Sequence, residues 1–201
     1  MKIFCIGRNY SEHIKELKNE VPDEPIVFMK PPGALLVQNK PFYFPDFTKE
    51  IHYEAELVIR ICKNGKQIEP HFASRYFKEV AFGIDFTARD LQSKLKSKGL
   101  PWELAKSFDK SAPISEFIPI ESLQQPIAFS LKKNGQIVQR GDSSMMMHTF
   151  DNLIVFLSKY WILQKGDMIF TGTPAGVGPI NIGDRLEGFI EDRLMMSCQI
   201  K

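Results

Sequence analysis

The stretch from Ile51 to Ile59 reads IHYEAELVI and places two glutamates, Glu54 and Glu56, in an apolar run that is typical of a β-strand. Residues two apart on a strand point to the same face, so the two carboxylates are expected side by side. Such a pair repels itself and resists burial, and a bound cation would remove that conflict. A second apolar run, from Val80 to Phe86, carries one acid near its end, Asp85.

These three carboxylates form a candidate metal site. They offer three oxygen ligands, and no cluster of cysteine and histidine accompanies them, which favours Mg2+ or Mn2+ over zinc. The alternative is an edge strand whose acidic side chains are simply solvated, a common arrangement.

The composition is that of one globular domain, and we expect residues 1–201 to form a single catalytic domain. The 26 basic and 24 acidic residues nearly cancel, so the net charge gives no argument for nucleic acid or an anionic membrane, and neither is expected as a partner. The apolar runs are too short for a membrane span or a secretion signal. The three scattered cysteines form no Cys-x-x-Cys pair, so a reducing cytoplasm is the expected location.

Short strands separated by turns dominate the pattern. Two Asn-Gly pairs, Asn64-Gly65 and Asn134-Gly135, predict β-hairpins. Further strands are expected at residues 168–171, 185–190 and 194–200. Helices are expected at 11–19, around 72–79, at 88–98 after a Thr87 cap, and at 152–160 after Thr149 or Asp151. The chain therefore predicts a mixed, β-rich α+β fold: a largely antiparallel, rolled β structure with a few peripheral helices.

The first of these helices carries a candidate acid–base pair. His13 and Glu16 are three residues apart and share a helix face, where a carboxylate fixes the tautomer of a histidine and raises its basicity. A solvated surface pair is the alternative. The helix is short and a polar, proline-bearing segment follows it, so residues 11–25 are predicted to form a lid that orders when substrate binds.

Three further segments carry polar groups suited to a substrate. Arg89 and Gln92 share the start of the helix that follows Asp85, and would suit a substrate carboxylate beside a metal. Lys106 lies in a mixed apolar setting and could neutralise an oxyanion. For both cations, an ordinary surface position is the alternative. The glycine-rich loop at 170–179 could hold a small anion through its backbone amides, or be an ordinary turn.

Six motifs in this order resemble the fumarylacetoacetate hydrolase family, and within it the short acylpyruvate hydrolase/oxaloacetate decarboxylase-like branch. The resemblance covers roughly residues 3 to 200. The motifs are GRNY at 7–10 with His13 and Glu16, FMKPP at 28–32, HYEAEL at 52–57, GIDFTARD at 83–90, KSFD at 106–109, and TGTPAGVG at 171–178.

This resemblance implies a rolled β-sandwich of the family's C-terminal domain type that usually forms homodimers. It implies that Glu54, Glu56 and Asp85 hold Mg2+ or Mn2+ and that His13 and Glu16 form a catalytic dyad on a lid. The positions that match substrate contacts or lead into the lid are Arg89, Gln92, Lys106, Thr173, Asn9 and Tyr10.

The expected activity is therefore metal-dependent hydrolysis of a carbon–carbon bond in a 1,3-dicarbonyl 2-oxo acid of the acylpyruvate type, with decarboxylation of oxaloacetate as a further reaction. An isomerase, tautomerase or decarboxylase of a related 2-oxo dicarboxylic acid is one alternative. A protein that binds metal and oxo acid without turnover is another.

Overall fold

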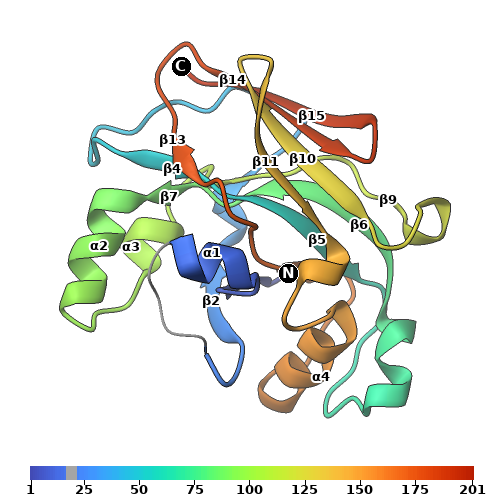
Figure 1. Ribbon diagram of the computed structural model, residues 1–201. Coiled ribbons are helices and arrows are strands. Elements are labelled where there is room, and N and C mark those ends of the chain that lie inside the picture. Colours follow the sequence, from blue (N-terminus) through green and yellow to red (C-terminus); the bar gives the residue numbers. More distant parts are fainter. Residues whose placement is uncertain (17–21) are drawn as a thin grey trace.

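The computed structural model describes residues 1–16 and 22–201 (Figure 1). Its largest sheet has six strands, and only the pairing of β1 with β12 in that sheet is parallel. In spatial order the strands are β2 (Ile26–Lys30), β1 (Ile3–Gly7), β12 (Met168–Phe170), β5 (Ala55–Ile61), β6 (Phe77–Ile84) and β9 (Ile118–Pro119).

A second, wholly antiparallel sheet covers one face of the first. Its strands are β11 (Gln136–Asp142), β10 (Ala128–Lys133), β14 (Arg185–Ile190) and β15 (Arg193–Gln199). The predicted hairpin at Asn134-Gly135 is confirmed: both residues have positive φ and join β10 to β11. Two small sheets complete the roll: β13 (Gly178–Pro179) with β4 (Ile51–Tyr53) and β7 (Thr87–Ala88), and β3 (Leu35–Leu36) with β8 (Ala112–Pro113).

The helices lie outside the sheets, as Figure 1 shows. They are α1 (Ser11–Glu16), α2 (Arg89–Ser97), α3 (Glu103–Lys106) and α4 (Phe150–Tyr160), with 3-10 turns at η1 (Pro32–Ala34), η2 (Pro70–Tyr76), η3 (Ile120–Ser122) and η4 (Ser143–Met145). The hydroxyl of Thr149 accepts a hydrogen bond from the backbone N–H of Asn152, so the predicted cap of α4 is confirmed. Thr87 instead lies in β7, and α2 begins without a side-chain cap.

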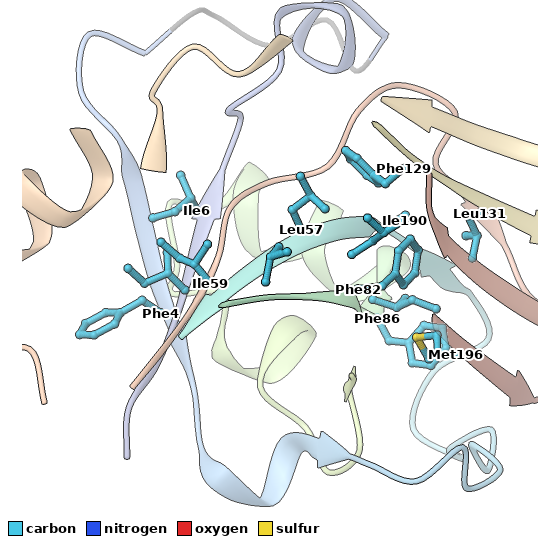
Figure 2. Close-up of a cluster of buried hydrophobic side chains, with 14 of the residues drawn as sticks. Phe4, Ile6, Leu57, Ile59, Phe82, Phe86, Phe129, Leu131, Ile190 and Met196 are labelled. Carbon is cyan, nitrogen blue, oxygen red and sulfur yellow. The ribbon is translucent and has the colours of Figure 1, made fainter. Parts of the chain in front are cut away.

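The main hydrophobic core lies in part between the two large sheets (Figure 2), and it continues to Leu153, Ile154 and Leu157 of α4. Leu57 and Phe82 come from the first sheet and meet Phe129 and Ile190 from the second. A Cβ atom on Gly188 would overlap the ring of Phe82, so a glycine is required there for the sheets to approach this closely. Replacing a buried Phe such as Phe82 by Ala would cost about 3–5 kcal/mol.

The expected β-rich α+β roll is confirmed, with three local differences. The run 51–59 divides into β4 and β5, which belong to different sheets and are separated at Glu54. The expected helix around 72–79 is the 3-10 turn η2 followed by β6. The expected hairpin at Asn64-Gly65 does not form, because Gly65 pairs with Leu163 instead.

The helices of the described residues are also short. None of them has the length and apolar character needed to cross a bilayer.

Candidate metal centre and active site

The three predicted carboxylates meet where β5 and β6 run side by side. Glu56 lies on β5 opposite Gly83 of β6, and Glu54 stands at the junction before β5. Asp85 follows the end of β6, and its backbone N–H donates to the carbonyl of Glu54 at 2.8 Å. One oxygen from each carboxylate lies within 4.8 Å of the others, and all three side chains are buried.

These buried carboxylates fit a hard divalent cation. Burial, and then the charge of Asp85, raises the pKa of Glu56 well above its usual range, although the N–H of Gly172 donates to its Oε2 at 2.8 Å. Asp85 Oδ1 is buried and accepts no hydrogen bond. Buried carboxylate oxygens that converge in this way are the donor set of a Mg2+ or Mn2+ site.

The ammonium group of Lys106 lies between two of the carboxylates. Its Nζ is 2.8 Å from Glu54 Oε2 and 2.6 Å from Asp85 Oδ2, and the side chain is 3% exposed. Burial by itself lowers the pKa of Lys106, but the carboxylates of Asp85 and Glu54 outweigh it, so the pKa lies above its usual value. A positive charge is therefore built into the site at the place where the acids converge.

A second buried lysine, Lys30, supports the same acid from behind. Its Nζ lies 2.8 Å from Asp85 Oδ1, without the geometry of a hydrogen bond, and it donates to Ser111 Oγ at 2.8 Å and to the carbonyl of Lys106. Sequence reasoning assigned no role to Lys30. The available signal was a lysine at the end of the apolar run from Ile26 in the FMKPP motif.

Arg89 and Gln92 occupy the same side of the site, as their spacing predicted. Arg89 Nη2 donates to Glu54 Oε1 at 2.6 Å, Nη1 donates to Gln92 Oε1, and Nε lies 3.3 Å from His52 Nδ1. The guanidinium is thus held in place by three neighbours. Burial, and then the charge of Arg89, lowers the pKa of His52, which favours the neutral imidazole.

Thr173 lies on the other side of the carboxylates, in the glycine-rich loop after β12. Its Oγ1 accepts a hydrogen bond from Gln139 Nε2 at 2.9 Å, while Gln139 Oε1 accepts from the N–H of Ala55 at 2.9 Å. Gln139 is 2% exposed and joins the loop to the start of β5. Sequence reasoning missed Gln139, because its position on β11 gives no local sign of this long-range contact.

Seven of the predicted residues line one small cavity of about 40 Å³. They are Glu54, Glu56, Asp85, Arg89, Gln92, Lys106 and Thr173. Ile6, Phe28 and Trp102 supply apolar walls, which exclude water and strengthen the electrostatic interactions inside.

Two predicted residues, Asn9 and Tyr10, do not line this cavity. The amide of Asn9 donates to the carbonyls of His148 and Thr171 at 3.0 and 2.8 Å and accepts from the N–H of His148 at 2.8 Å. Tyr10 is 1% exposed, and burial, followed by the charge of Glu56, raises the pKa of its hydroxyl well above the usual range. Both side chains anchor the segment that leads into α1, and their contact with substrate stays a prediction.

The predicted lid is described in part. Both carboxylate oxygens of Glu16 accept from the N–H of Gly176, at 3.1 and 3.2 Å, which docks α1 on the glycine-rich loop. The side chain of His13 and residues 17–21 lie outside the described residues. The pairing of His13 with Glu16 and the lid at 11–25 therefore stay predictions.

Comparison with known proteins agrees with this geometry. The family model "Fumarylacetoacetate (FAA) hydrolase C-terminal" matches residues 2–201. The chain is 41% identical to oxaloacetate tautomerase FAHD1, mitochondrial, of Mus musculus, over 99% of this chain and 91% of that protein. It is 40% identical to oxaloacetate decarboxylase, mitochondrial, of Dictyostelium discoideum, over 90% of this chain and 85% of that protein.

A solved structure shares the whole architecture. The crystal structure of fumarylpyruvate hydrolase from Pseudomonas aeruginosa in complex with Mn2+ and pyruvate has a TM-score of 0.94 and 34% identity, covering 100% of this chain and 89% of that one. Sequence, fold and the buried acidic site lead to the same conclusion: this chain belongs to the fumarylacetoacetate hydrolase C-terminal family.

Proposed function

We propose that this protein is a metal-dependent enzyme that acts on short 2-oxo acids of the oxaloacetate type through an enolate, interconverting keto and enol forms and decarboxylating the same acid. The observation that carries this proposal is the buried carboxylate triad with Lys106 in contact with two of its members. With a divalent cation held by the carboxylates, such a site would stabilise negative charge that develops on a substrate oxygen. The names of the tautomerase and decarboxylase relatives support it.

Glu54, Glu56 and Asp85 would hold Mg2+ or Mn2+. When bound, the metal would act as a Lewis acid for the 2-oxo and carboxylate oxygens of the substrate and so favour enolate formation. Arg89, held by Glu54 and Gln92, would orient the substrate carboxylate. Lys106 would balance charge on the enolate oxygen, and the apolar walls would keep water away.

Hydrolysis of an acylpyruvate-type 1,3-dicarbonyl acid is the second candidate. It is favoured by one observation: Glu16 docks α1 on the loop that also carries Thr173 of the cavity. His13, oriented by Glu16, would then take a proton from a water molecule that attacks the distal carbonyl. The fumarylpyruvate hydrolase neighbour supports this candidate.

Purified protein mixed separately with oxaloacetate and with acetylpyruvate, with Mg2+, Mn2+ or chelator, tests the proposal. Loss of enol absorbance and product identification would be followed. Metal-dependent turnover of oxaloacetate alone supports tautomerisation or decarboxylation, and metal-dependent release of pyruvate and acetate from acetylpyruvate supports hydrolysis. Binding of oxalate without turnover of either substrate would instead support a non-catalytic binding protein.

A homodimer and a cytoplasmic location also remain proposals, the dimer implied by the family resemblance. Light scattering coupled to size exclusion would give the mass of the assembly, to be compared with 23.1 kDa for one chain.

A further inference from the structure

The cavity has acidic and basic regions in distinct places. The three carboxylates form its buried inner end, while two further cationic residues line it, Arg8 and Lys96. Arg8 is half-buried and Lys96 is exposed, so these two mark the mouth of the cavity. The proposed function assigns no role to either residue.

Helix α2 explains why Lys96 belongs to this mouth. Arg89, Gln92 and Lys96 are spaced by three and four residues, which places them on one face of the helix, and all three line the cavity. The seven steps from Arg89 to Lys96 span about 10 Å along the helix. Because Arg89 contacts Glu54, Lys96 lies farther from the carboxylates than Arg89 does. Arg8, Arg89 and Lys96 line the same cavity, and partial burial, followed by the charges of Arg8 and Arg89, lowers the pKa of Lys96.

Arg8 reaches the mouth from the other side through an unusual backbone. It follows β1 with a φ of 58°, in the left-handed region that non-glycine residues rarely adopt. Its neighbour Asn9 is fully buried and makes three hydrogen bonds to the backbone of His148 and Thr171, which hold this conformation. Residues with strained backbone cluster at ligand sites, where contacts with the surrounding structure offset the cost of holding the side chain in the required direction.

Arg89 belongs to the inner end of the cavity and not to its mouth. Its guanidinium already contacts Glu54, Gln92 and His52, so it is held at the inner end beside the carboxylates. Of the cationic residues that line the cavity, Arg8 and Lys96 are the ones at its mouth, where the outer part of a ligand would lie.

We propose that Arg8 and Lys96 bind a second, distal carboxylate of the substrate and thereby make the enzyme selective for 2-oxo dicarboxylic acids over 2-oxo monocarboxylic acids. This inference rests on the proposed function, with the 2-oxo carboxylate end of the substrate at the acidic inner site. A guanidinium and an ammonium converging on one carboxylate give charge-assisted hydrogen bonds. Each pairing contributes a factor of roughly 10–100 in affinity or specificity.

Oxaloacetate and its 4-monomethyl ester form a matched pair of substrates for keto–enol conversion, because the ester lacks the distal charge. The ester cannot lose CO2, so the test follows keto–enol conversion and not decarboxylation. In keto–enol conversion, the wild-type protein should show a kcat/KM for oxaloacetate at least about tenfold above that for the ester. In the double variant Arg8→Gln/Lys96→Gln this preference should disappear through a higher KM for oxaloacetate, with the ester unchanged. Equal losses on both substrates, or an unchanged preference, would overturn the assignment.

Two control variants separate loss of the distal carboxylate contact from a general effect on the structure. Lys94→Gln removes the same charge from α2 at an exposed position outside the cavity lining, and should leave the preference intact. Lys96→Gln alone changes an exposed side chain, so it should fold normally and show part of the effect.

Binding of unreactive ligands separates this inference from the proposed function. Malate and lactate differ by the distal carboxylate, and calorimetry on the Mn2+-loaded protein should show tighter binding of malate, by about tenfold or more, that is lost in the double variant. If neither oxo acid is turned over but this difference is present, the proposed function fails and the carboxylate site stands. If wild-type protein binds malate and lactate equally, the carboxylate site is wrong.

Discussion

The ammonium of Lys106 lies 2.6 Å from Oδ2 of Asp85, inside the group of carboxylates that could hold a metal. The same Nζ is 2.8 Å from Glu54. Lys106 therefore acts as an internal counter-ion, and a metal that binds through Glu54 Oε2 and Asp85 Oδ2 would compete with it for those oxygens.

The first prediction is that Lys106→Met raises metal affinity and lowers turnover. Removing the ammonium frees the oxygens of Glu54 and Asp85, so the Kd for Mn2+ should fall by about tenfold or more, since charged hydrogen bonds of this kind contribute about 1.5–3 kcal/mol. Turnover of oxaloacetate should fall because the enolate loses a cation. Calorimetric titration with Mn2+ measures the first effect, and the exposed Lys98→Met serves as the control. Weaker Mn2+ binding in Lys106→Met would contradict the competition.

Glu56→Gln should separate metal binding from folding. The amide keeps the shape of the side chain and can still accept from Gly172, but it carries no charge into a buried site where the pKa of Glu56 is already raised. Melting temperature in chelator should therefore be equal to or above that of wild type, while the increase caused by Mn2+ should largely disappear. An undiminished increase with Mn2+ would show that Glu56 is not a ligand.

Asn9→Ala should destabilise the fold by about 2–4 kcal/mol, because it leaves buried backbone groups of His148 and Thr171 without their partner. Urea unfolding measures this. Asn9→Asp should also destabilise, since a carboxylate cannot donate to the two carbonyls. A variant with wild-type stability and a raised KM would instead identify Asn9 as a substrate contact.

His13→Ala should distinguish the two candidate reactions. A general base contributes about 10²–10⁴-fold, so hydrolysis of acetylpyruvate should fall by that factor. Keto–enol conversion of oxaloacetate should fall less, because its charge stabilisation is assigned to Lys106 and the metal. The rates of the variant and of wild type are measured on both substrates, and the affinity for Mn2+ is measured to verify that the metal site is intact. Hydrolysis at the wild-type rate would remove the dyad from the mechanism.

The thiols should differ sharply in reactivity. Burial raises the pKa of Cys198 to about 11, and burial followed by the charge of Asp85 raises the pKa of Cys5 well above its usual range. Because a raised pKa leaves almost no thiolate at pH 8, native protein should react with iodoacetamide mainly at the half-buried Cys62. Mass spectrometry of labelled peptides measures this, and Cys62→Ser should abolish the fast phase. Fast labelling of Cys5 would mean that the core opens readily.

The two Asn-Gly pairs show how far local patterns reach. Asn134-Gly135 forms its hairpin because the flanking strands pair only with each other and with their sheet neighbours. Gly65 packs so closely on the ring of Tyr76 that a Cβ atom would overlap it, and its backbone pairs with Leu163, about a hundred residues away. The Asn-Gly dipeptide therefore forms a hairpin at one position and not at the other, and the long-range pairing of Gly65 with Leu163 makes the difference.

The sequence by itself determined the β-rich class of fold, the candidate metal ligands and most of the residues that line the cavity, because these follow from periodicity, spacing and ordered motifs. Only the tertiary structure decided that Glu54 stands at a junction between two sheets. It also brought Lys30 and Gln139 to the site, although Lys30 lies 55 residues before Asp85 in the chain and Gln139 lies 54 residues after it. It alone placed Lys106 among the carboxylates and Arg8 with Lys96 at the mouth. The physical reason is that burial and pairing of charges depend on which distant segments pack together, and no local pattern records that.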